Sequence, residues 1–213
     1  MTTGHRGIFV TLNGLGGAGK STTTEHLCRY LTDQDYTVHA TTEPSHGRLG
    51  EIARYGTDTY SGHALACLVA ADRYHHLDTE IRPNLEAGAD RRLRSLRRLF
   101  LRAATHERRA GRVIEAINAA ADVPDLAVVL TADPTVTAHR IGQRGAHNRF
   151  EAGITTSRTE ADLYRDTTAR LAERGYPLLT VDTTDTTPAQ VVAAIGGRIA
   201  HLAGVPQTDT TTA

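Results

Sequence analysis

Several residue types are scarce in this chain of 213 residues, and each shortage narrows the class of protein. Two cysteines, Cys28 and Cys67, are too few for a disulfide framework and indicate a reduced, cytoplasmic setting. We interpret both as small core residues on helices. No apolar run approaches the roughly 20 residues that span a bilayer, and the polar segment 1–7 does not resemble a secretory signal. We therefore expect a cytoplasmic protein without a membrane partner.

The chain has no excess of charge of either sign, because 24 basic residues balance 24 acidic ones. This balance gives no overall basic field for nucleic acid, so we expect no nucleic-acid partner. Lysine is nearly absent, since Lys20 is the one lysine among the basic residues. It falls in a glycine-rich segment, where this residue type has a specific function.

Short β-branched runs alternate with alanine-rich or amphipathic segments along the chain. The expected strands are 7–12, 37–41, 126–131 and 177–181, and the expected helices are 21–31, 61–77, 113–121, 159–174 and 188–202. Asp133 and Pro134 begin a further helix, and Pro83 is expected to help end the helix that starts at residue 61. The alternation predicts an α/β fold with a mostly parallel sheet, covered on both faces, and ligands at the carboxyl ends of the strands.

Residues 14–21 read Gly-Leu-Gly-Gly-Ala-Gly-Lys-Ser and match the pattern GxxxxGK[ST] between an expected strand and an expected helix. The glycines let backbone N–H groups turn inward around phosphate oxygens, and the helix adds its positive end. We expect Lys20 to act in catalysis on the β- and γ-phosphates of ATP, and Ser21 to hold Mg²⁺. The predicted nucleotide-binding residues are Gly14, Gly17, Ala18, Gly19, Lys20, Ser21 and Thr22. The pattern alone does not separate a kinase from a GTPase or an ATPase.

Further short segments follow in a fixed order. They are Thr-Glu-Pro at 42–44, Leu-Gly-Glu at 49–51, Ala-Ala-Asp-Arg at 70–73, Ile-Arg-Pro at 81–83, Pro-Asp-Leu at 124–126, Asp-Pro at 133–134 and Asn-Arg-Phe-Glu at 148–151. In this order they resemble the thymidylate kinase family over roughly residues 7–203. The resemblance implies a P-loop NTPase three-layer sandwich with a five-stranded parallel sheet. It also implies one domain over 1–206 with a lid at about 142–156, followed by a tail at 207–213 that we expect to be disordered.

The resemblance further implies transfer of the γ-phosphoryl group of ATP to dTMP, with ATP and Mg²⁺ as cofactors, and a homodimer. It implies that Arg73 binds the thymine and that Glu43 shapes the acceptor site. In one branch of the family the lid supplies arginines to the transferred phosphoryl group. The candidates are Arg140, Arg144 and Arg149, and we favour Arg144 and Arg149 as the catalytic pair.

Three positions depart from the family pattern on the acceptor side. Gly16 replaces an acid that contacts the sugar, and Val69 replaces an aromatic residue that stacks on thymine. Thr42 replaces an arginine, and Arg48 is a candidate to take over its contact with the substrate. These departures leave open a kinase for another nucleotide or nucleoside-like metabolite.

A larger departure lies at residues 91–112, where the family has an apolar strand ending in Asp-Arg-Tyr. Here the segment carries nine arginines and one acid, Glu107. Because unpaired buried charges are costly, we expect no central strand from it and doubt the strand after Asp90. Two interpretations are a surface helix, with Leu93, Leu96 and Phe100 on one face, and a patch for nucleic acid or anionic lipid. If the segment is genuine, we expect poor stability and little activity, and a non-catalytic nucleotide-binding remnant is the alternative.

The third interpretation concerns the reading frame. Codons can be chosen for residues 92–109 so that the frame one base later begins Val-Cys-Asp-Arg-Tyr-Val-Ala-Ser-Ser-Tyr. Free choice of third bases guarantees some agreement, but a whole motif in its family position is much harder to obtain. The hypothesis is a one-base insertion near Arg91 and a compensating loss near Arg112.

Overall fold

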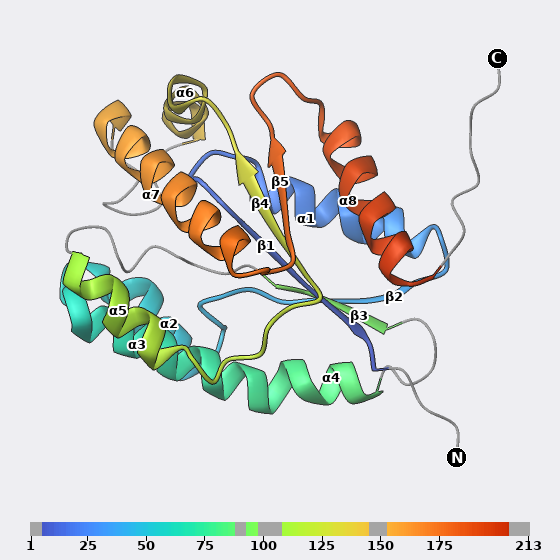
Figure 1. The fold of residues 1–213 in the computed structure, drawn as a ribbon, viewed down its shortest axis with the longest axis horizontal. Coiled ribbons are helices and arrows are strands. Elements are labelled where there is room, and N and C mark those ends of the chain that lie inside the picture. The colour runs from blue at the N-terminus through green and yellow to red at the C-terminus, as the bar shows by residue number, and fades with distance from the viewer. Residues whose placement is uncertain (1–5, 88–92, 98–107, 145–152, 205–213) are drawn as a thin grey trace.

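The computed structural model describes residues 6–87, 93–97, 108–144 and 153–204. All strand pairs are parallel, and the sheet has the order β2-β3-β1-β4-β5 (Figure 1). The strands are β1 (Ile8–Gly14), β2 (Thr37–Ala40), β3 (Leu93–Arg97), β4 (Leu126–Thr131) and β5 (Leu178–Asp182). The predicted α/β architecture, a parallel sheet flanked by helices, is confirmed.

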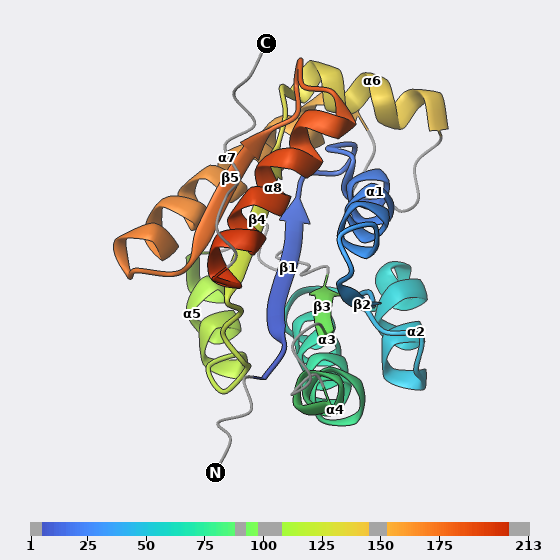
Figure 2. The ribbon, with the colours of Figure 1, turned by 90° about the vertical axis from the view of Figure 1, so that its right-hand side faces the viewer.

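Helices lie on both faces of this sheet (Figures 1 and 2). One face carries α1 (Lys20–Thr32) and α8 (Pro188–Leu202), which pack on each other. The other face carries α3 (Gly62–His76), a π-helical turn (Leu77–Ile81), α4 (Arg82–Ala87), α5 (Arg108–Ile117) and α7 (Gly153–Glu173). Helix α2 (Arg48–Tyr55), which leads into a 3-10 turn (Gly56–Asp58), packs on α3, and α6 (Pro134–Arg144) packs on α7. None of the helices in these described ranges is long and apolar enough to cross a membrane.

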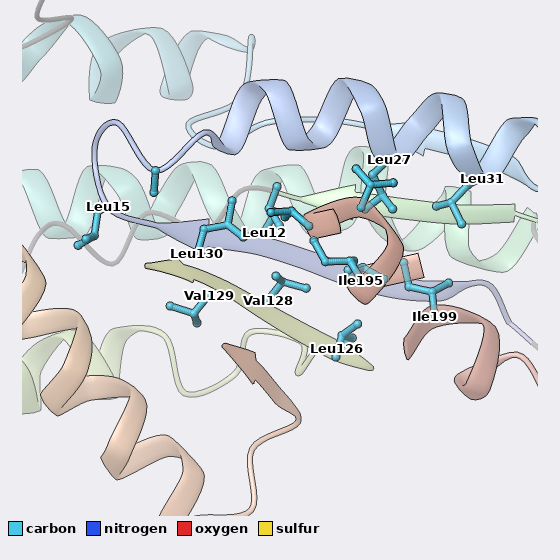
Figure 3. Packing of buried hydrophobic residues seen from close by; sticks show 14 of the residues in the cluster. Leu12, Leu15, Leu27, Leu31, Leu126, Val128, Val129, Leu130, Ile195 and Ile199 are labelled. Atoms are coloured by element: carbon cyan, nitrogen blue, oxygen red, sulfur yellow. The ribbon is translucent and has the colours of Figure 1, made fainter. Parts of the chain in front are cut away.

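The main core lies between the sheet and the helix pair α1 and α8 (Figure 3). Successive side chains of a strand point to opposite faces, and β1 follows this rule. Val10 and Leu12 join the core under α1 and α8, whereas Phe9 packs with Leu77 and Ile81 on the opposite face. Alternate apolar side chains of β1 therefore supply both layers, which fixes the strand in the centre of the sheet.

The expectation that residues 91–112 provide no central strand is wrong for part of the segment. Strand β3 lies between β2 and β1, with Arg94 opposite Val38 and Ile8. The prediction considered side-chain charge, but a ladder is formed by backbone N–H and C=O groups, which need partners whatever the side chains are. Leu93 and Leu96 lie in strand β3 and not in a helix, so the surface-helix interpretation is wrong for both. Phe100 lies outside the described residues.

The helical segment that begins at Gly62 also runs further than expected. It continues through the π-helical turn and α4 to Ala87, so Pro83 lies inside it. Pro83 directly follows the π-helical turn, where the Arg82 amide donates to the Leu77 carbonyl five residues back, so the regular α-helical hydrogen-bond pattern is already interrupted there. The interpretation of the cysteines is wrong for Cys67, which is exposed on α3. Cys28 is half-buried on α1, and burial raises the pKa of its thiol.

The packing of α8 gives a test of this core. Ile195 is fully buried, and Ile195→Ala is expected to lower the free energy of unfolding by about 2–5 kcal/mol, because it leaves a cavity between α8 and the sheet. Leu202 on the same helix is 39% exposed, and Leu202→Ala is expected to cost about 1 kcal/mol or less. Urea denaturation of both variants measures the difference; equal losses would contradict the assigned packing.

Candidate functional site

The glycine-rich segment forms a tight loop between the end of β1 and the start of α1. Gly14, Gly17 and Gly19 have φ values of 144°, 77° and 84°, a region that residues with a Cβ rarely adopt. A Cβ on Gly17 would lie 2.7 Å from the carbonyl oxygen of Thr137, so this glycine is needed for space as well. The first N–H groups of α1 have no partners within the helix, and the loop brings them to the carboxyl edge of the sheet.

Three neighbouring elements hold the loop in place. The Leu15 amide donates to the Leu130 carbonyl of β4 at 3.3 Å, and the Thr183 hydroxyl, just after β5, donates to the Ala18 carbonyl at 3.3 Å. The amide of Gly16 donates to the carboxylate of Glu160 on α7 at 3.1 Å in a buried setting. The loop is therefore pre-formed by contacts that lie far away in the sequence.

Lys20 is buried and its ammonium group is folded back over the loop. Its Nζ donates to the carbonyl of Gly14 at 2.6 Å and to that of Leu15. Ser21 and Thr22 follow in the first turn of α1 and are exposed. A lysine over the loop, inward-turning backbone and an exposed hydroxyl form a donor set that fits nucleotide phosphates, with Ser21 free of steric cover for Mg²⁺.

A second polar cluster lies beyond the carboxyl end of β2. Glu43 follows β2 and is 1% exposed, and its Oε2 accepts a hydrogen bond at 3.3 Å from Nε of Arg73 on α3. Nη1 of Arg73 donates to Oδ1 of Asn118, just after α5. Burial lowers the pKa of Arg73 to about 10, against the opposing effects of Tyr74, Asp72 and Tyr176, so the guanidinium stays charged at neutral pH.

Arg73 borders a cavity of about 320 Å³ between the sheet and the helices α3, α5 and α7. Val69, one turn earlier on α3, lines the same cavity, as do Thr11 and Asn13 of β1. Residues four apart on a helix share a face, which explains why the two expected base-contacting positions face one space. The cavity combines apolar walls with a few convergent polar groups, as small-molecule sites do.

A larger groove of about 820 Å³ lies at the carboxyl ends of β4 and β5, beside Leu15 of the loop. Asp133, Arg158 and Asp182 are among its lining residues. Its place agrees with the expectation that ligands bind at the carboxyl ends of parallel strands.

The remaining expected site residues are four arginines, and the part of the chain that the structure describes does not bring them together at one place. Arg48 is exposed at the start of α2, and no ion pair or hydrogen bond of its side chain is found within the described ranges. Arg140 on α6 donates to the carbonyls of Thr183 and Thr184 at 2.9 and 3.3 Å, next to the loop. The side chain of Arg144, the last residue of α6, and the whole of Arg149 lie outside what the structure describes.

Sequence reasoning missed three polar residues at these sites: Glu160 and His76, which are buried, and Asn118, which is half-buried. Glu160 contacts a residue 144 positions away, and Asn118 contacts one 45 positions away. No local pattern reports such pairs. The one signal at Glu160 is an acid on a helix of mixed sequence, with Asp162 two positions later, and many solvated helix positions share it.

The parallel sheet, the glycine loop between β1 and α1 and the lysine folded over that loop define a P-loop nucleotide-binding protein. The family model for thymidylate kinase matches residues 12–195. This chain is 32% identical over 181 residues to the probable thymidylate kinase of Pyrobaculum aerophilum, covering 80% of this chain and 86% of that protein. The thymidylate kinases of Clavibacter sepedonicus and Leifsonia xyli are 37% and 36% identical, covering 68% and 71% of this chain and 72% and 77% of theirs. The chain belongs to the thymidylate kinase family.

The loop geometry predicts different effects for two glycine substitutions. Gly17→Ala is expected to weaken binding of a non-hydrolysable ATP analogue at least about tenfold, because the new Cβ meets the Thr137 carbonyl and distorts the loop. Gly62→Ala is the control, since Gly62 has a φ of 55° but open space around its Cβ position. It is expected to lower stability without changing nucleotide affinity. Calorimetric titration of both variants measures this, and equal affinities would argue against the assigned loop.

Proposed function

We propose that this protein transfers the γ-phosphoryl group of ATP to the 5′-phosphate of dTMP, giving dTDP. The observation that carries the proposal is the pairing of a pre-formed P-loop, with Lys20 over it, and a buried Arg73–Glu43 pair on the wall of a nearby cavity. Membership of the thymidylate kinase family supports dTMP as the acceptor. We also propose a single domain over residues 1–206 and, from the resemblance alone, a homodimer.

The loop residues Gly14, Gly17, Ala18, Gly19, Lys20, Ser21 and Thr22 would bind the phosphates of ATP. Bound ATP and Mg²⁺ would supply the reactive phosphoryl group and neutralise its charge. Lys20 would exchange its carbonyl partners for phosphate oxygens, and the hydroxyl of Ser21 would hold the metal. Glu160 would keep the loop in its binding conformation through the amide of Gly16.

On the acceptor side, Arg73 would donate hydrogen bonds to the base in the cavity that it borders. Glu43 would orient the guanidinium by accepting from its Nε. Arg48, Arg144 and Arg149 are proposed to contact the phosphates, the last two from a lid at about 142–156 that closes over both substrates. Closure would exclude water, which competes with dTMP as the acceptor.

An ADP-release assay tests the reaction directly. With ATP and Mg²⁺, dTMP is expected to give the fastest turnover in a panel with dUMP, dCMP and dGMP. Lys20→Met is expected to lower the rate at least about a hundredfold, because a charge that stabilises the transferred phosphoryl group is lost. Arg29→Gln, an exposed cation on the same helix, is the control and should leave the rate unchanged. A clear preference for another acceptor would reject dTMP as the substrate.

The arginine-rich segment bears on how active this chain is. Inner strands of a parallel sheet are covered on both faces and usually read as continuous apolar runs, as β4 does over its first five residues. Strand β3 reads Leu-Arg-Ser-Leu-Arg in an inner position. This contrast supports the hypothesis that residues 92–109 are read one base out of frame.

A DNA read across the codons for Asp90 to Val113 is expected to show an extra base near Arg91 and a missing one near Arg112. A chain that carries the shifted-frame sequence in place of residues 92–109 should then phosphorylate dTMP much faster than the literal chain, because it regains Asp-Arg-Tyr. Codons that confirm the arginines, together with rapid turnover by the literal chain, would overturn the hypothesis.

A further inference from the structure

His76 is a buried histidine next to the acceptor cluster, and no role has been assigned to it so far. Its side chain is 1% exposed on the last turn of α3, one turn after Arg73. Nδ1 faces Oε1 of Glu43 at 3.9 Å, and within the described residues Nδ1 has no hydrogen-bond partner. Buried polar atoms are rarely left in this way, so the contact with Glu43 calls for an explanation.

The other ring nitrogen of His76 is anchored toward the protein surface. Nε2 lies 2.9 Å from the hydroxyl of Thr41 and 3.1 Å from Oε2 of Glu80. Glu80 is 38% exposed, and its Oε1 lies 2.9 Å from Nε2 of His39 on β2. Burial alone would raise the pKa of Glu80, but hydrogen bonds from Thr41 and His39 outweigh it and leave this pKa below its usual value. The anchor is therefore a carboxylate.

The contacts form one chain from Glu80 through His76 and Glu43 to Arg73. A carboxylate oxygen faces each ring nitrogen of His76, Oε1 of Glu43 at 3.9 Å from Nδ1 and Oε2 of Glu80 at 3.1 Å from Nε2. Asp72, the neighbouring acid on α3, is instead bound to the amide and hydroxyl of Ser45. The imidazole is thus the link between the surface anchor and the carboxylate that contacts Arg73.

We propose that His76 is a positioning residue that acts through Glu43 to fix the guanidinium of Arg73 at the acceptor cavity. It does not reach the reacting groups itself. Arg73 has three carbon–carbon rotors and would otherwise sample several orientations at an entropic cost. With Glu43 on Nε and Asn118 on Nη1, the plane of the guanidinium is set before any ligand enters. The proposal makes acceptor affinity, and not ATP affinity, depend on a histidine behind the site.

The first test needs no ligand, so it is independent of which nucleotide is the substrate. The Nε–H signal of Arg73 is assigned in a ¹⁵N NMR spectrum by its loss in Arg73→Lys. His76→Phe is expected to shift or broaden this signal, and His75→Gln, an exposed neighbour on the same helix, should leave it unchanged. His76→Asn places an amide near the Nδ1 position, whereas His76→Gln places one near Nε2. The asparagine variant is expected to retain the wild-type signal and the glutamine variant to lose it.

The second test rests on the proposed function, because it uses dTMP. Calorimetric titration is expected to show about tenfold weaker dTMP binding for His76→Phe and His76→Gln, with binding of an ATP analogue unchanged. If His76→Phe does not fold, the comparison of the asparagine and glutamine variants decides. An unchanged Arg73 signal in His76→Gln and in folded His76→Phe, or equal weakening of both nucleotides, would overturn the proposal. If the wild-type protein does not bind dTMP but the Arg73 signal responds as expected, dTMP is excluded as the substrate and the positioning role of His76 stands.

Discussion

Backbone pairing between β1 and β4 continues past the end of β1, and the nucleotide loop depends on it. Gly14 is in register with Leu130, and the next amide, Leu15, donates to the Leu130 carbonyl. A Cβ on Gly14 would collide with that same carbonyl oxygen, so the strand turns into the loop where glycine permits the closest approach to β4. The position of every phosphate-facing amide in the loop follows from this junction.

The acceptor side is organised by buried charge instead of backbone pairing. Arg73 and Glu43 are both nearly inaccessible, and a buried ion pair repays its desolvation only when the geometry is good and the remaining polar atoms are satisfied. Asn118, just after α5, accepts from Nη1 of Arg73, and Nδ1 of His76 on α3 lies 3.9 Å from Oε1 of Glu43. Such a cluster contributes less to stability than an apolar core of the same volume, but it holds a cation in one orientation.

Local signals in the sequence predicted the glycine-rich loop between β1 and α1 and much of the fold. The loop was predicted because its pattern is contiguous, and α8 was bounded correctly at 188–202 because Pro188 follows Thr187, which forms a capping box with Gln190. Glu43 and Arg73 were singled out only through resemblance and Asn118 was missed, because these three residues are far apart in the sequence and meet only in the folded chain. The strand at Leu93–Arg97 was missed because a rule about buried charge was applied to a ladder made by the backbone.

The fold of Lys20 onto its own loop has a consequence for how affinity arises. Its ammonium already donates to two carbonyls, so a phosphate oxygen that takes over one of these donors would replace a hydrogen bond to a neutral oxygen. The gain then lies in the difference between an anionic acceptor and a neutral carbonyl. We therefore expect the contribution of Lys20 to affinity to depend on ligand charge: a charged terminal phosphate would gain over the carbonyls, and a neutral mimic of the same shape would have no advantage over the protein's own backbone.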